Sequence, residues 1–173
     1  MSDSFEWDPV DFVSAGAVGE PGARTFYIQA EHSGQRAAFV LEKSQVRTLA
    51  QLAQELLARG GVEVVPDDLD VAAQQLREPV VGWWRIGAIG LGEDAERERF
   101  LLELTELVEE DAEDEARGAR LWLDTDQLVG LAAHAAFAVE AGARETCRLC
   151  GRPIDPVEGH VCPATNGHGA LTV

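Results

Sequence analysis

Alternation of apolar and polar residues in the first part of the chain predicts three strands and then a helix. We expect the strands at residues 11–19, 24–31 and 35–41, because turn sequences rich in Gly and Pro separate them. Apolar residues spaced three and four apart then predict a helix that begins after a Ser44 cap and ends at Gly60-Gly61. One face of this helix carries Val46, Leu49, Ala50, Ala53, Leu56 and Leu57.

The same pattern occurs again further along the chain. Strands are expected at about 80–90, 98–108 and 117–123, followed by a helix capped by Thr125 or Asp126. At an offset of 82 positions, six residues of the first unit recur in the second: Leu41, Gln45, Leu49, Ala50, Ala53 and Gly60 return as Leu123, Gln127, Leu131, Ala132, Ala135 and Gly142. Upstream, residues 16–19 are echoed by 87–90. The pattern indicates an internal duplication.

These patterns predict an α+β fold built from two β-β-β-α repeats. The repeats are expected to form one mainly antiparallel sheet of about six strands, with both helices on one face so that their apolar sides share a core. The duplicated core is predicted to span residues 1–143, with copies at about 10–61 and 80–143. The linker at 62–79 is expected to contain a short helix that starts at Pro66.

The last 27 residues contain all three cysteines, in a spacing typical of a zinc site. Two residues separate Cys147 from Cys150, and His160 and Cys162 follow with one residue between them. Three thiolates and one imidazole would complete a tetrahedral shell around Zn²⁺ with no open position, which is the mark of a structural site. His168 is the alternative fourth ligand, and His160 is favoured because a ligand inside the turn orders less chain. We therefore predict a small zinc-ribbon-like module at residues 144–173.

The charge of the chain restricts its partners. The formal net charge is −17, and residues 1–143 contain 28 acidic against 11 basic side chains. Such a surface repels phosphate backbones and anionic membranes, so nucleic acid and membrane are disfavoured as partners. The acidic start has neither a signal peptide nor a membrane anchor, which favours a cytoplasmic location.

A few further side chains are candidates for function. Trp83-Trp84-Arg85 places neighbouring aromatic residues on a strand, so one Trp is expected in the core and the other outside. Glu31, His32 and His134 could converge in a cleft between the repeats, although a partly buried, hydrogen-bonded core histidine is the favoured interpretation of His134. Residues 109–115 contain six acids and are expected to form a solvated loop.

Two segments of the chain resemble a known family. The sequence around residues 7–12 and 19–26, together with Cys-Arg-Leu-Cys-Gly-Arg-Pro-Ile-Asp-Pro at 147–156 and Gly-His-Val-Cys-Pro at 159–163, is similar to a family of uncharacterised actinobacterial proteins. The family is classed as a domain of unknown function, so the resemblance implies a cytoplasmic bacterial protein and supplies no activity. Its closing motif ends in Asn-Gly-Tyr, where this chain has Asn166-Gly167-His168, which favours His160 as the zinc ligand.

The sequence therefore predicts a non-enzymatic, cytoplasmic binding or adaptor protein with a structural zinc and a protein partner. Phosphate-binding glycine motifs and nucleophile elbows are absent from the sequence. Two alternatives stay open. One is an enzyme that uses a cleft between the repeats, and the other is nucleic-acid binding through the zinc module.

Overall fold

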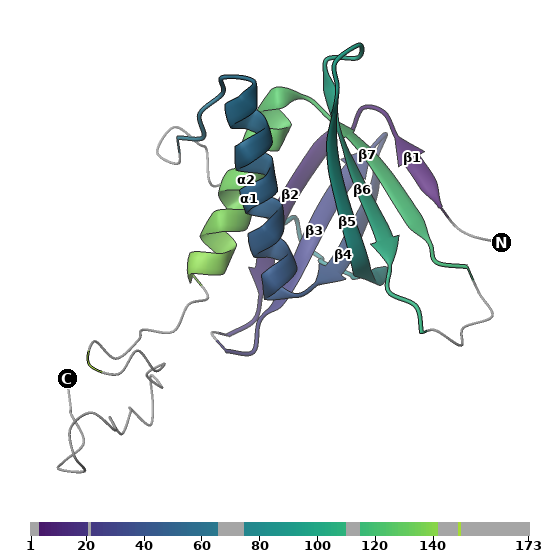
Figure 1. Cartoon of the computed structure of the whole chain (residues 1–173). Helices are drawn as coiled ribbons and strands as arrows, with labels where there is room; N and C mark the ends of the chain where they lie inside the picture. The colour runs from purple at the N-terminus through teal and green to yellow at the C-terminus, as the bar shows by residue number, and fades with distance from the viewer. Residues whose placement is uncertain (1–3, 21, 66–74, 110–114, 142–148, 150–173) are drawn as a thin grey trace.

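The computed structural model describes residues 4–20, 22–65, 75–109, 115–141 and 149. This part of the chain forms an α+β fold in which one sheet of seven strands packs against two helices (Figure 1). In chain order the elements are β1 (Phe5–Trp7), β2 (Phe12–Val18), β3 (Thr25–His32), β4 (Gln35–Leu41), α1 (Lys43–Arg59), β5 (Trp84–Asp94), β6 (Arg99–Glu106), β7 (Gly118–Leu123) and α2 (Thr125–Ala141). The predicted α+β class with a mainly antiparallel sheet is confirmed. Neither described helix is long and apolar enough to cross a membrane.

The sheet is mainly antiparallel, with one parallel pairing inside it and another at one edge. The strand order is β1-β7-β6-β5-β4-β3-β2. Parallel pairs join β1 to β7 and β4 to β5, and the other neighbours are antiparallel. The expectation of about six antiparallel strands misses β1, because three residues are too few for a sequence pattern. Only the apolar-polar-apolar order of Phe5-Glu6-Trp7 signals this strand.

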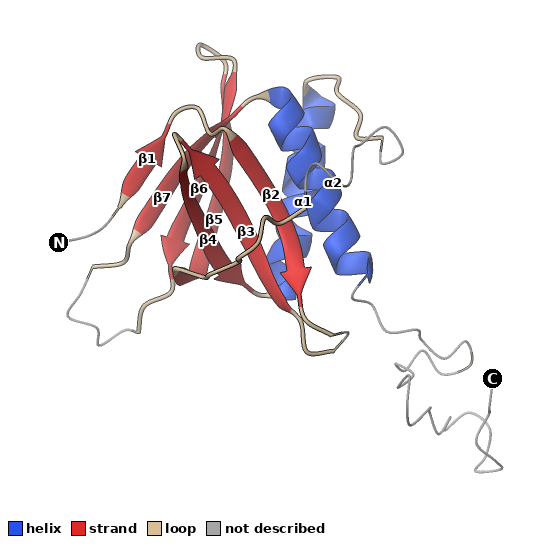
Figure 2. Ribbon diagram, turned by 180° about the vertical axis from the view of Figure 1, so that it is seen from behind, coloured by secondary structure: helices blue, strands red, loops and turns tan. Residues whose placement is uncertain are grey.

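The sheet curves until its two edge strands meet at one end. β1 and β2 lie at opposite edges, yet only residues 8–11 join them. Within that connection, the amide of Val10 donates to the carbonyl of Trp122 on β7 at 3.0 Å. The next amide, of Asp11, donates to Glu31 on β3 at 2.8 Å. The connection therefore ties both edges together (Figures 1 and 2).

The core lies between the inner, concave face of the sheet and both helices, which pack against each other. Inward-facing side chains alternate along every long strand, as Ile28, Phe39, Leu102 and Leu121 do on four neighbouring strands. Burying side chains of this size stabilises the fold by about 1.5–3 kcal/mol each. The prediction that both helices cover one face is confirmed, and Figure 1 shows them side by side.

Two details of the predicted elements are wrong. The predicted strand at 80–90 begins only at Trp84 and continues to Asp94. The helix caps also lie earlier than expected: Glu42 replaces Ser44, and Asp124 replaces Thr125 or Asp126. In both helices a glutamine three residues after the cap reaches back to the cap amide, which is the second half of a capping box.

The late start of β5 has a structural reason, because residues 75–83 cross the outer face of β2, β3 and β4 (Figure 2). The fully buried Gln29 on β3 binds the backbone of Arg77 in both directions, accepting from its amide at 2.7 Å and donating to its carbonyl at 3.0 Å. Gly16 on β2 leaves room for Leu76, since a Cβ there would lie 2.8 Å from the Leu76 Cγ. The predicted short helix after Pro66 falls at 66–74, outside the described residues.

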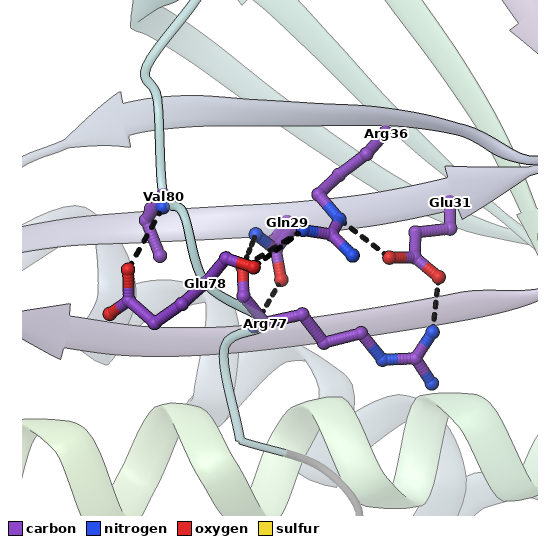
Figure 3. A network of polar contacts seen from close by, with 6 residues as sticks. All are labelled: Gln29, Glu31, Arg36, Arg77, Glu78 and Val80. Carbon is purple, nitrogen blue, oxygen red and sulfur yellow. Dashed lines mark hydrogen bonds and ion pairs between the residues drawn. The ribbon is translucent and has the colours of Figure 1, made fainter.

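Charged side chains reinforce this crossing (Figure 3). Arg36 donates to Glu31 at 2.6 Å and to the Glu78 carbonyl at 3.1 Å. Arg77 pairs with the other Glu31 oxygen, and its guanidinium carbon lies 3.9 Å from the Phe12 ring centroid. Glu31 is thus held between two arginines, and the crossing segment is fixed to the sheet.

Candidate functional site

The tryptophan pair divides as its strand geometry predicts. Trp84 is the first residue of β5 and is buried, with 6% of its surface exposed. Trp83 precedes the strand and is 48% exposed, although its amide donates to Ala38 on β4 at 2.7 Å. The Trp83 ring meets Phe5 and Phe39 edge-on, with centroid separations of 5.9 and 6.4 Å. The Trp83 ring is therefore held by Phe5 and Phe39, while about half of the residue is exposed to solvent.

Further apolar side chains are exposed near Trp83. β6 ends and β5 begins at this end of the sheet, where the Leu107 amide donates to the carbonyl of Arg85 at 2.8 Å. Val81 is 65% exposed, Leu107 58% and Val108 39%. We call Val81, Trp83, Leu107 and Val108 the Trp83 surface. Exposed apolar groups gathered in one region, rather than scattered singly, are typical of interaction sites.

The rim of the Trp83 surface is acidic. The acidic sequence at 109–115 follows Val108 directly, and its described residues, Glu109 and Glu115, are both exposed. Glu106 at the end of β6 accepts from Arg117 at 2.5 and 2.7 Å, and this hydrogen bonding holds the pKa of the Glu106 carboxyl below its usual value. Arg85 pairs with Glu42. An apolar centre with carboxylates beside it suits a partner that carries apolar and basic side chains.

The three residues proposed for a catalytic cleft are not brought together. Glu31 points to the outer face of the sheet, where Arg36 and Arg77 occupy its oxygens (Figure 3). His32 donates through Nδ1 to the Pro9 carbonyl at 2.7 Å and stacks on Trp7, with ring centroids 5.8 Å apart. His134 lies on α2 and packs near β2. These contacts give Glu31 and His32 structural roles.

His134 is buried, as expected, but without the expected hydrogen bond. Its side chain is 7% exposed, and Nε2 is the buried side-chain atom that has no partner among the described residues. The ring lines a cavity of about 470 Å³ between α2 and β2, together with Arg24, Glu78 and Phe137. Burial lowers the pKa of His134, because the charged imidazolium loses its hydration.

The predicted zinc ligands Cys147, Cys150, His160 and Cys162 lie outside the described residues, as does the alternative His168. Within the described ranges, no group of three or more His, Cys, Asp or Glu side chains could hold a metal ion. A zinc site in this protein would therefore have to use residues from the remaining part of the chain.

Fold and surface together define an α+β protein with a curved mixed sheet and an exposed apolar edge. The chain belongs to the family described as "Protein of unknown function (DUF3090)", whose model matches residues 5–162. The matched range ends at Cys162 and so includes the four predicted zinc ligands. No curated protein and no solved structure matches the chain at a significant level.

Proposed function

We propose that this protein is a non-enzymatic, cytoplasmic binding protein that recognises a protein partner through the Trp83 surface. The observation that carries the proposal is the half-exposed Trp83, held on an aromatic base and accompanied by exposed Val81 and Leu107. Tryptophan and arginine are enriched at interface centres, and Arg85 lies two residues from Trp83. The partner would offer an apolar segment flanked by Lys or Arg, since carboxylates border the surface.

The energy available from Trp83 is sufficient for a measurable interaction. A buried aromatic side chain removes about 150–250 Å² from water, so covering the open half of Trp83 removes about 100 Å². At about 20 cal/mol per Å², the lower end of the usual range, this contributes about 2 kcal/mol, or about thirtyfold in affinity. Because the Trp83 ring already packs on Phe5 and Phe39, binding orders the side chain little further, and the entropic cost is small.

The zinc module is the second part of the proposal. Residues 144–173 would bind one structural Zn²⁺ through Cys147, Cys150, Cys162 and His160, as a unit distinct from the core at 1–143. Only four residues separate Gly142 from Cys147, so Cys147 would lie near the end of α2. The duplicated origin of the core is also proposed, and the recurring order of three strands and a helix supports it.

The test is affinity capture from the native host with the tagged full chain, comparing wild type with Trp83→Ala. Any captured protein is then purified and titrated against both forms. We expect the Trp83→Ala variant to bind about thirtyfold more weakly. The matched control is Leu52→Ala, which removes a 41% exposed apolar side chain from α1.

Equal affinity of wild type and Trp83→Ala for the purified partner would contradict the proposal. A loss that Leu52→Ala shares would indicate a general effect of surface apolarity and would also contradict it. Urea unfolding of each variant checks that the Phe5 and Phe39 packing survives, so that weaker binding is not a consequence of unfolding.

A further inference from the structure

The two halves of the sheet can be compared residue by residue through their hydrogen-bonded registers. β4 and β7 correspond at the offset of 82 positions, which pairs Ala38 with Arg120 and Arg36 with Gly118. The pairing partners of these residues on the neighbouring strands define two rows of side chains on the outer face of each half. In the first half, the rows are Ser14-Gln29-Ala38 and Phe12-Glu31-Arg36. In the second half, they are Gly90-Glu103-Arg120 and Ala88-Thr105-Gly118.

This comparison corrects one part of the predicted repeat. Gly16 faces Tyr27, which faces Val40, and the corresponding path in the second half leads from Trp122 through Leu101 to Gly92. Gly16 therefore corresponds to Gly92, and the predicted match of 16–19 to 87–90 is wrong by five positions. The predicted match rested on similar glycine spacing in the two segments. Strand register decides which residues correspond, and the sequence alone does not define register.

In the first half, the two outer rows hold an extended segment of the chain. Gln29, from one row, binds the Arg77 backbone, and Arg36, from the other row, donates to the Glu78 carbonyl. The bound segment is the part of the chain that follows α1, the helix of the same half. It crosses the strands rather than extending the sheet (Figure 3).

In the second half, the corresponding rows border a groove of about 730 Å³. Its walls contain both rows, and its floor contains Ile89, Leu104 and Ala119, which lie between the rows on their strands. The groove is open because small residues line it. Ala88, Gly90 and Gly118 stand where the first half has the larger Phe12, Ser14 and Arg36. The far edge of the groove is formed by Ser4, Phe5 and Glu6 of the β1 region.

The chemistry of the groove differs from that of the first half at its centre. Glu103 stands where Gln29 stands and is 53% exposed, and it forms an ion pair with Arg120 at 3.2 Å. An ionised carboxylate only accepts hydrogen bonds, whereas the Gln29 amide both donates and accepts. An occupant of this groove must therefore supply donors, such as backbone amides or arginine side chains.

We propose that the groove binds residues 142–173 of the same chain. In the first half, the segment after the helix reaches the outer rows 18 positions beyond Arg59, at Arg77, and 32 residues follow Ala141 in the second half. Eighteen residues span up to about 60 Å, enough to reach the opposite face of a domain of this size. By the same count, the second segment reaches the groove near residue 159, and its backbone amides supply the donors for Glu103. The inference uses the residues of the proposed zinc module but does not rest on zinc binding or on the Trp83 surface.

The test places a photo-crosslinking benzoylphenylalanine at Thr105, which is exposed in the groove, in the full-length protein. After irradiation, we expect a covalent bond to a peptide from residues 142–173, found by mass spectrometry in the monomer fraction. Mixing heavy-isotope and light chains before irradiation shows whether the two peptides come from one molecule. The same probe at exposed Gln35, at the start of β4, is the matched control and should give no such product.

A charge series completes the experiment. In the Thr105 probe background, Glu103→Gln restores the side chain found at position 29 and should retain the crosslink, whereas Glu103→Lys should lower its yield at least fivefold. Crosslinks to a second copy, to another protein or to no peptide would overturn the proposal. An undiminished yield in Glu103→Lys would overturn the role of Glu103 in holding the segment.

Discussion

Gln45 and Gln127, 82 positions apart in the sequence, make the same pair of hydrogen bonds in the two halves of the fold. Each Oε1 accepts from the amide of its helix cap, Glu42 at 2.8 Å and Asp124 at 3.0 Å. Each Nε2 donates to a carbonyl in the other half. Gln45 reaches Ile86 on β5 at 3.1 Å, and Gln127 reaches Val10 before β2 at 2.8 Å.

These hydrogen bonds are reciprocal. The start of each helix binds a backbone carbonyl in or just before the first long strand of the opposite half. The parallel pairings follow the same rule: β4 pairs with the start of β5, and β7 pairs with β1, which leads into β2. Trp84 and Trp7, both 6% exposed, occupy corresponding inward positions in these pairings. This reciprocity supports the proposed duplication and gives a physical reason why both halves of the fold are needed, since neither half can satisfy these bonds alone.

The first prediction concerns the two glutamines. Gln45→Ala and Gln127→Ala should each lower the free energy of unfolding by about 1–2 kcal/mol, because each loses a cap bond and a bond to a strand carbonyl. Urea unfolding measures the change. Gln54→Ala, an exposed change on α1, is the control and should cost under about 0.5 kcal/mol. Losses that differ strongly between the two glutamines would argue against equivalent roles.

The second prediction concerns the crossing segment on the outer face. Gln29→Leu should lower the free energy of unfolding by about 1–3 kcal/mol, because it leaves the Arg77 amide without its partner and removes one of the two donors to the Arg77 carbonyl, the other being Arg36. Exposed Gln35→Leu on β4 is the matched control. Hydrogen exchange should also accelerate at the Arg77 amide, and an unchanged exchange rate there would show that Gln29 does not hold the segment.

The sequence predicted the elements that have a strong local period. Strand β4 and the limits of α1 and β6 were placed within two residues, because alternating strands and a one-sided helix leave a clear pattern. β1 and the start of β5 were missed, since both depend on tertiary contacts. Phe5–Trp7 is a strand because β7 offers it a parallel edge, and Pro79–Gly82 is no strand because it covers β3 and β4 instead.

The candidate site was predictable only in outline. Two adjacent tryptophans on one strand must face opposite ways, so the sequence could predict one exposed indole but not which one. Trp83 is the exposed residue because it precedes the strand, whereas Trp84 pairs with Phe39 inside the curved sheet. The donors around Glu31 could not be predicted either, since Arg36 and Arg77 come from separate segments and meet only in the folded chain.

The third prediction is a pH dependence that arises from His134. Its pKa is lowered in the folded state, so the unfolded chain binds more protons below the ordinary histidine pKa of about 6.5. The free energy of unfolding should therefore rise with pH between about 5 and 7, and this stability is lost as the pH falls. Arg24 and Glu78 are the other charged residues that line the same cavity.

His134→Leu tests this dependence with the residue that occupies the corresponding position 52 in the first half. The variant should flatten the pH profile of unfolding between about 5 and 7 and be more stable than wild type at the acidic end, because no imidazole must stay neutral there. His32→Gln serves as the control and should keep the slope. A slope that survives in His134→Leu would show that another group causes it.

The last prediction concerns zinc and the independence of the core. Native mass spectrometry should find one Zn²⁺ per chain, which Cys150→Ser abolishes, and His160→Ala should weaken binding while His168→Ala should not. Removing zinc with a chelator should leave the circular dichroism of α1 and α2 nearly unchanged, because their buried side chains pack on each other and on the sheet. Apparent zinc binding of about 10–16 kcal/mol would then stabilise only the segment that contains the ligands. Global unfolding in chelator would instead show that residues 144–173 belong to the core, and a metal-free native protein would refute the zinc site.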